Sequence, residues 1–209
     1  MNSAYPVDDR ILRSLWSSKN PLPVSPKDFE NIGKPSSIRQ AMARLVKAGK
    51  LRRIRRGLYE RPRVHPIIGQ TPSDPLAVVE SIMLERSAPW QVSGAYAANL
   101  LGLSEQVPAQ LVINTTAQVS PISLGNIQIR FRRVAPSSLV GGRRQTGLVI
   151  QAVRHLGPNG VTQQSINRLQ RQLKPATKRE LQKLVLQVPR WMKPVIQQLA
   201  ASGPTPAIP

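Results

Sequence analysis

A dense run of cationic side chains occupies residues 38–62, where nine Lys or Arg residues are interleaved with regularly spaced apolar ones. Arginine can bond bidentately to the O6 and N7 atoms of guanine, and glutamine can do the same with adenine. Arginine also presents a planar fork of donors that fits phosphate. The neighbours Arg39 and Gln40 could therefore read base edges, and the later cations of the run could hold a duplex backbone.

We predict two groups of DNA-contacting residues in this region. The first group lies on a helix and its ends and comprises Ser36, Ser37, Arg39, Gln40, Arg44, Lys47 and Lys50. The second lies on a β-hairpin and comprises Arg52, Arg53, Arg55 and Arg56. Residues early in the helix would meet bases, whereas Arg44, Lys47 and Lys50 suit phosphates. The alternative is a solvated basic face that touches nothing specific.

The elements around these residues predict a winged helix-turn-helix. A first helix is expected over residues 8–18, and a short second helix is expected between Ser25 and Gly33. Ser37–Gln40 has the form of a capping box that opens a third helix to about residue 48. Ile38, Ala41, Met42 and Leu45 would form the buried stripe of that helix. Two short strands, 51–54 and 58–59, would form the wing.

The rest of the chain predicts a mixed α and β region, so the fold class is α+β. Residues 61–73 are rich in turn formers and indicate a linker. Helices are expected after Asp74 and over 93–101, and strands over 109–116 and 126–134, followed by a polar loop around Gly141–Gly147. Further helices would begin at Thr162, at Thr177, and at Pro189 or Pro194. The expected domains are a DNA-binding domain (1–63), an α/β domain (64–201) and a disordered tail (202–209).

Charge limits the classes of partner. The 209 residues carry 30 Lys and Arg against 10 Asp and Glu, a net charge of +20. Residues 1–64 hold fifteen bases and five acids, residues 65–128 one and four, and residues 129–209 fourteen and one. Two basic ends therefore flank a slightly acidic middle. Such a field attracts DNA, RNA, an anionic membrane surface or an acidic protein.

Residue types for catalysis or metal binding are scarce. The chain has no cysteine, which excludes disulfides, thiolate metal sites and cysteine nucleophiles. Its two histidines, His65 and His155, lie far apart in the sequence, and no phosphate-binding loop or H-E-x-x-H motif occurs. We therefore expect no catalytic residue, no cofactor and no metal. No apolar run is long enough for a membrane helix and no signal peptide is recognisable, so a cytoplasmic protein is expected.

Several separated segments resemble one family. The stretch "SSIRQAMARLVKAGKLRRIRRGLYERP" is similar to the winged helix of AbiEi-type antitoxins, and "QVSGAYAANLLGLSEQVPAQLVINT" is similar to the segment that follows it there. "AVRHLGPNGVTQQSINRLQRQL" and "WMKPVIQQLA" resemble the C-terminal helices of such proteins. The likeness spans most of residues 5–201.

This resemblance implies an antitoxin of a type IV toxin–antitoxin system. Such a protein counters a nucleotidyltransferase-like toxin without needing a stable complex with it. It also represses its own operon by binding inverted repeats in double-stranded operator DNA. For this chain the resemblance puts DNA contact on Ser36 to Lys50 and Arg52 to Arg56, and toxin neutralisation within residues 65–201. It identifies no individual neutralising residue.

Two other functions stay open. One is a winged-helix transcriptional regulator without a toxin partner. The other is an RNA-binding protein, although the low aromatic content, 4%, offers few side chains on which single-stranded bases could stack. The C-terminal helices are equally open, because their basic residues fit ordinary polar faces, a second anion-binding surface or a docking face for an acidic protein.

Overall fold

The computed structural model describes residues 5–17, 22–67, 69–106, 108 and 110–201. The fold is α+β, as predicted, and the chain divides into two units, Met1–Arg86 and Ser87–Pro209. The expectation that residues 1–63 form the DNA-binding domain and 64–201 a second domain stays a prediction. The tail expected over 202–209 lies outside the described residues.

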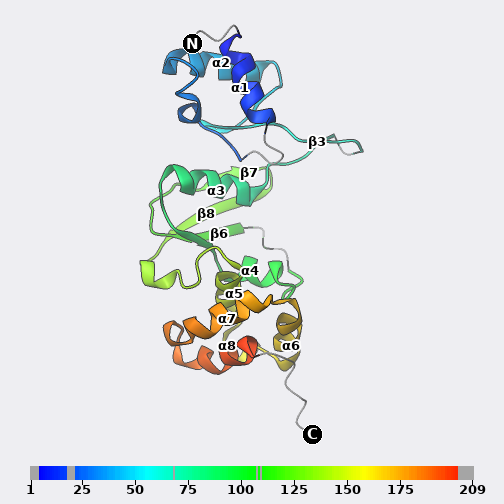
Figure 1. Ribbon diagram of the computed structural model, residues 1–209. Coiled ribbons are helices and arrows are strands. Elements are labelled where there is room, and N and C mark those ends of the chain that lie inside the picture. The colour runs from blue at the N-terminus through cyan, green and yellow to red at the C-terminus, as the bar shows by residue number, and fades with distance from the viewer. Residues whose placement is uncertain (1–4, 18–21, 68, 107, 109, 202–209) are drawn as a thin grey trace. The chain divides into compact units, whose positions relative to one another are not determined.

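The first unit begins with the elements of a winged helix-turn-helix (Figure 1). They follow one another in the chain as α1 (Val7–Trp16), the 3₁₀ helix η1 (Pro26–Phe29), α2 (Pro35–Lys47), β1 (Arg52–Arg55) and β2 (Leu58–Glu60). The strands β1 and β2 form an antiparallel hairpin. An isolated antiparallel bridge joins Val24 to Tyr59, so the segment before η1 pairs with the hairpin and ties it to the helices.

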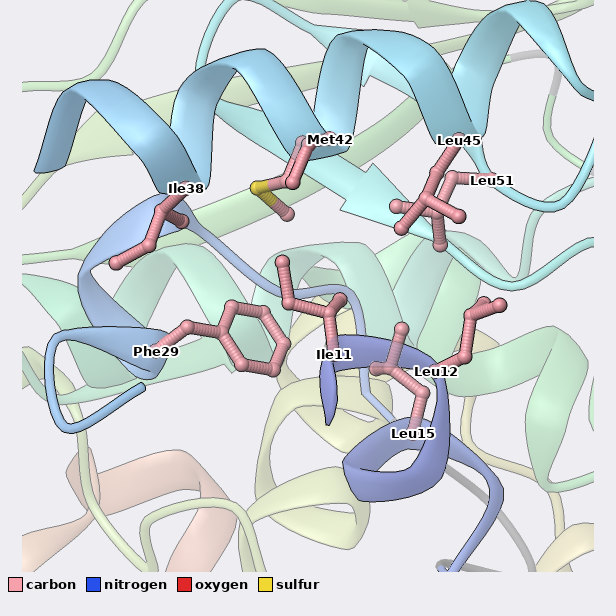
Figure 2. Packing of buried hydrophobic residues seen from close by; sticks show 9 residues of the cluster. Ile11, Leu12, Leu15, Phe29, Ile38, Met42, Leu45 and Leu51 are labelled. Carbon is pink, nitrogen blue, oxygen red and sulfur yellow. The ribbon is translucent and has the colours of Figure 1, made fainter. Parts of the chain in front are cut away.

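The core of this part is a cluster of apolar residues from the three helices and from the segment after α2. Ile11 of α1, Phe29 of η1, Met42 of α2 and Leu51 after it are all at most 2% exposed. Figure 2 shows these side chains converging from the three helices. The stripe of α2 is confirmed, because Ile38, Ala41, Met42 and Leu45 are all buried. Trp16, the last residue of α1, lies outside this core and is 54% exposed.

The start of α2 differs from the prediction. The helix begins at Pro35, two residues before the expected capping box at Ser37. Proline suits the first helical position because its φ is already fixed and its missing N–H would have no partner there. The end agrees with the prediction: Gly49 has φ +68°, and Lys50 N–H donates to Leu45 O at 2.9 Å. This is the glycine-ended termination in which left-handed backbone closes the last turn.

The expected linker contains a second small hairpin, which sequence reasoning missed. Its strands are β3 (Val64–His65) and β4 (Gly69–Gln70), paired antiparallel. Helix α3 (Pro75–Glu85) follows, and Asp74 caps it as predicted, with Oδ1 accepting from Leu76 N–H at 2.9 Å.

The second unit contains a four-stranded mixed sheet in the order β5-β6-β8-β7. The predicted strands are confirmed as β6 (Gln110–Thr115) and β8 (Ile127–Arg133), which run parallel. The edge strands β5 (Trp90–Val92) and β7 (Ile122–Leu124) were not predicted. The short helix α4 (Gly94–Leu100) lies between β5 and β6 in the chain, and Gly102 follows it with φ +66°.

A helical region completes the second unit. It comprises η2 (Pro136–Ser138), α5 (Gln145–Gly160), α6 (Gln163–Gln172), α7 (Pro175–Leu184), η3 (Val185–Gln187), η4 (Arg190–Met192) and α8 (Lys193–Ala200). Helix α5 was missed, and it begins inside the expected loop around Gly141–Gly147. Helix α6 begins after Thr162 as predicted, whereas α7 begins at Pro175 rather than at Thr177. The hydroxyl of Thr177 instead donates to Gln145 Oε1 at 2.9 Å.

Candidate nucleic-acid interface

Helix α2 presents the residues that were predicted to read bases. Burial of its stripe fixes the rotation of the helix, because Ile38, Ala41 and Met42 are 0% exposed. Arg39 and Gln40 lie on the opposite side and are exposed. Among the described residues, the side chains of these two form no hydrogen bond or ion pair with another group. Their donors and acceptors are thus available to an external partner.

The ends of α2 carry most of the remaining helix candidates. Ser36 is exposed and Ser37 half-buried in the first turn, beside backbone N–H groups that have no partner within the helix. Lys47 in the last turn and Lys50 beyond it are exposed. Such a helix start favours an anion, and the lysines suit phosphate as point charges.

Arg44 is the exception on this face, because it is already paired. Its Nη2 lies 2.6 Å from Asp8 Oδ1 and its Nε donates to Asp8 Oδ2 at 3.1 Å. Hydrogen bonding by the guanidinium lowers the pKa of Asp8, and the same contact raises the pKa of Arg44. A phosphate would have to compete with the carboxylate of Asp8 for Arg44.

The hairpin β1–β2 divides its four arginines by environment. Arg52 faces Glu60 across the ladder, and the Nη2–Oε1 distance is 2.6 Å. Its Nη1 also donates to Thr71 O at 3.0 Å, while Glu60 accepts from the hydroxyl of Ser73. Across the ladder Arg52 is therefore compensated by an acid of the hairpin itself. This side chain ties the hairpin to the segment that follows it.

The other three arginines are less tightly held. Arg53 is exposed, and its Nε donates over 3.4 Å to Arg55 O. Arg56 is exposed at the turn, beside Gly57 with its φ of +79°. Arg55 is half-buried, and its buried Nε has no hydrogen-bond partner in the described chain. Burial lowers the pKa of Arg55, with repulsion from Arg86 acting in the same direction.

Three exposed cations that adjoin α2 or the hairpin β1–β2 in the chain were missed by sequence reasoning. Lys34 is the N-cap residue of α2. It was overlooked because the helix was expected to open at Ser37. Arg61 and Arg63 are exposed just beyond β2. They continue the basic run of the hairpin, and that continuity was the available signal.

The second unit carries its own exposed cations. They include Arg171, Lys174, Arg179, Lys183 and Arg190 on the C-terminal helices. Glu180, the only acid in residues 129–209, accepts from the Thr146 hydroxyl at 2.6 Å and pairs with Arg144 at 2.7 Å. These contacts, that of Thr146 first, lower the pKa of Glu180. The carboxylate is therefore held within the unit.

Other kinds of site are sparsely represented. A cavity of about 660 Å³ lies in the first unit, lined by residues of α1, η1 and α3 and bordered by the 3.6 Å ion pair of Lys27 and Glu85. His65 and His155 are exposed in different units. Across the described ranges, no group of three or more His, Asp or Glu residues is placed to hold a metal. None of the described helices is long and apolar enough to cross a membrane.

Comparison with known proteins identifies a family. The model of a "Family of unknown function (DUF6088)" matches residues 10–181. No match was found among curated proteins. Among solved structures, the crystal structure of the RV2827C protein from Mycobacterium tuberculosis is similar, with 16% sequence identity and a TM-score of 0.48. That similarity covers 95% of this chain and 82% of the other. Since the family model spans most of the sequence, the chain belongs to the DUF6088 family of unknown function.

Proposed function

We propose that this protein is an AbiEi-type antitoxin that represses its own operon by binding operator DNA and has no catalytic activity. The observation that carries the DNA-binding half is the exposed face of α2 beside the hairpin. Arg39 and Gln40 present unused donors and acceptors there, and Arg53 and Arg56 are exposed on the hairpin. This combination is typical of a helix that enters the major groove next to a wing on the flanking backbone.

The contacts of the described residues suggest which role each candidate residue has in DNA binding. Arg39 and Gln40 would read base edges, because they lie in the first half of α2 and have the groups that pair with guanine and adenine. Ser36, Ser37, Lys47, Lys50, Arg53 and Arg56 would hold phosphates. Arg44 would join them on exchanging Asp8 for a phosphate. Arg52, which is bonded to Glu60 and Thr71, would act by fixing the hairpin.

The toxin-directed half of the proposal rests on the sequence resemblance to AbiEi-type antitoxins. The exposed cations of the second unit are compatible with it, because a surface with a single acid in residues 129–209 could engage an anionic partner. The nucleotidyltransferase-like toxin and any neutralising surface remain part of the proposal.

The DNA-binding half is tested by titrating the purified chain against the duplex upstream of its own reading frame. A scrambled duplex and a structured RNA of equal length serve as controls. We expect preference for the upstream duplex and a steep loss of affinity with salt. The variant R39A/Q40A should lose that preference while keeping non-specific affinity. Equal binding to all three nucleic acids would overturn sequence-specific repression, and a preference for RNA would favour an RNA-binding protein.

The toxin half needs a separate experiment. The neighbouring reading frames are inspected for a nucleotidyltransferase-like product, which is then expressed with and without this chain. We expect growth arrest with the toxin alone and rescue on co-expression. Rescue should persist in the R39A/Q40A variant, since neutralisation is assigned to residues 65–201. Specific DNA binding without any rescue would identify a winged-helix regulator that has no toxin partner.

A further inference from the structure

The hairpin β3–β4 carries exposed apolar side chains in the first unit. Its described residues from 63 to 67, together with 69 and 70, are all exposed. Val64 is 71% exposed and Ile67 is 87% exposed. Figure 1 shows β3 extending away from the helices of its own unit. Single exposed apolar residues are ordinary on protein surfaces, but two of them on a projecting ribbon call for a more specific explanation.

The base of this hairpin is fastened to the wing. Thr71 N–H and its hydroxyl both donate to Arg63 O, at 2.8 and 3.2 Å. Arg52 of β1 donates to Thr71 O at 3.0 Å while pairing with Glu60 of β2. A two-stranded ribbon buries too little surface to be stable alone. These bonds to the wing therefore hold its base, so that wing and hairpin form one continuous structure.

The charge of the hairpin matches a polyanion. Arg61 and Arg63 are exposed on the segment between β2 and β3, and residues 61–73 contain no acid. The ribbon thus has cations near its base, where Val64 also lies, and the exposed Ile67 at its turn. An acidic protein would be attracted to the two arginines, but an acidic surface would not by itself favour the highly exposed Ile67. DNA accommodates both, because apolar side chains can enter between base steps in the minor groove while cations hold the adjacent phosphates.

The length of the hairpin also suits this partner. Arg63 is followed by the strand residues Val64 and His65, which span about 7 Å at the rise of a β-strand, and then by the turn residues Pro66 and Ile67, which carry the tip further out. The minor groove of B-DNA is roughly 7.5 Å deep. A cation at position 63 could therefore remain at the backbone while the side chain at position 67 reaches the bases.

We propose that the β3–β4 hairpin is a second DNA-contacting element, which places Ile67 in the minor groove beside the wing and Arg61 and Arg63 on its phosphates. The inference rests on the proposed DNA binding and extends it beyond α2 and the wing. It assigns to the hairpin β3–β4 an apolar wedge that depends little on the base sequence of the DNA. This hairpin lies outside both α2 and the hairpin β1–β2.

The test compares the full-length variants I67S and L186S. Leu186 is a matched control, because it is 82% exposed but lies in the second unit. Affinity for the upstream duplex and hydroxyl-radical footprints, which report minor-groove access, are measured for both variants and the wild type. We expect I67S to bind about tenfold more weakly, as loss of a buried apolar side chain would predict, and to lose one patch of minor-groove protection. L186S should match the wild type.

A second variant tests the cations independently. R61Q/R63Q should reduce the slope of log affinity against log salt by roughly two, one for each released phosphate contact. Because these positions are exposed, circular dichroism should show unchanged folding in both hairpin variants.

The outcomes distinguish this inference from the proposed function. If the wild type binds the duplex and I67S shows the same affinity and the same footprint, only the hairpin assignment is overturned. A wild-type chain that binds no duplex would overturn the proposed function as well. The sedimentation of I67S is also compared with that of the wild type. If it differs while the DNA footprint stays intact, the tip contacts a second copy of the chain, and its DNA role is overturned.

Discussion

Arg44 of α2 and Asp8 of α1 form a bidentate ion pair, with Nη2–Oδ1 and Nε–Oδ2 distances of 2.6 and 3.1 Å. The pair holds one cation of the candidate DNA-reading face in an internal contact. A phosphate that replaces Asp8 would leave the carboxylate close to a polyanion. The free protein therefore opposes DNA binding at this position, and the opposition can be measured.

Replacing Asp8 by Asn should tighten DNA binding, because it releases Arg44 and removes a nearby negative charge. The matched control is Asp9→Asn, which changes the net charge equally at an exposed neighbouring residue. We expect the D8N variant to gain more affinity for the upstream duplex than D9N, with a salt slope steeper by about one. Equal gains in the two variants, measured by fluorescence anisotropy, would show that Arg44 does not reach a phosphate.

Substitutions of the arginines of the hairpin β1–β2 should affect either the stability of the fold or the affinity for DNA, depending on the position. Arg52→Ala leaves the Glu60 carboxylate, whose side chain is 12% exposed, without its cation. We expect a loss of about 1–3 kcal/mol in the free energy of unfolding. Arg53→Ala and Arg56→Ala change exposed side chains and should alter stability by less than about 0.5 kcal/mol. Each should instead weaken DNA binding and reduce the salt slope by about one.

Urea unfolding and salt-dependent titration of the same three variants provide the measurements. Arg52→Lys is a useful companion, since it keeps the charge but loses the fork that spans Glu60 and Thr71. It should recover part of the stability. If Arg53→Ala destabilises the chain as much as Arg52→Ala, the division of roles within the hairpin is wrong.

The parts of the fold that depend on periodicity could be predicted from sequence. The stripe Ile38, Ala41, Met42 and Leu45 repeats at helical spacing, so both the helix and its buried face followed from the order of residues. That stripe also placed Arg39 and Gln40 outside. The three-residue strand β5 offered no such repeat. Helix α5 was not predicted because its first turn contains Gly147 and the helix begins shortly after Gly141 and Gly142, so the whole stretch has the composition of a loop.

The pairing of charges could not be predicted in the same way. Arg44 and Asp8 are separated by 36 residues, and nothing in their local sequence reports that α1 and α2 bring them together. Arg52 and Glu60 lie on strands that were predicted, but facing residues depend on the register, which shifts between Arg53 and Arg55. Sequence therefore identified the cations, whereas which of them are free depends on tertiary structure.

The pH dependence of stability should report the contacts of Glu180. Its folded-state pKa is lowered, chiefly by the Thr146 hydroxyl and then by Arg144. The contribution of a depressed carboxyl is therefore fully present above its unfolded pKa, near 4.3, and is lost as the pH falls through the folded value. Glu180→Gln should cost about 1–2 kcal/mol of unfolding free energy at pH 7. The difference from the wild type should begin to shrink below about pH 4 and vanish only once the pH is below the folded-state pKa.

Chemical unfolding at several pH values between 2.5 and 7 gives this comparison directly. Glu105→Gln is the control, because Glu105 is an exposed acid of the same unit. Its effect should be small throughout that range. A cost of E180Q that stays constant down to pH 3 would mean that the lost contacts do not depend on ionised Glu180.

The first turn of α5 should not tolerate a methyl group at Gly147. A Cβ there would lie 2.0 Å from Gly142 O and 2.5 Å from Gln91 Nε2. That amide nitrogen donates to Val140 O at 2.7 Å and to Gly142 O at 2.6 Å, while Gln91 Oε1 accepts from Gln151 at 2.8 Å. Gly147→Ala must therefore displace backbone and break buried hydrogen bonds together, and we expect a loss of about 3 kcal/mol or more.

Gly33→Ala is the matched substitution, since its Cβ would meet only Val7 Cγ2, at an ordinary 3.7 Å. It should leave the free energy of unfolding within about 1 kcal/mol of the wild type, because alanine there restricts the unfolded chain without straining the folded one. Urea unfolding of both variants, followed by far-UV circular dichroism, measures the difference. Nearly equal urea midpoints for Gly147→Ala and Gly33→Ala would mean that the loop before α5 rearranges at little cost in free energy.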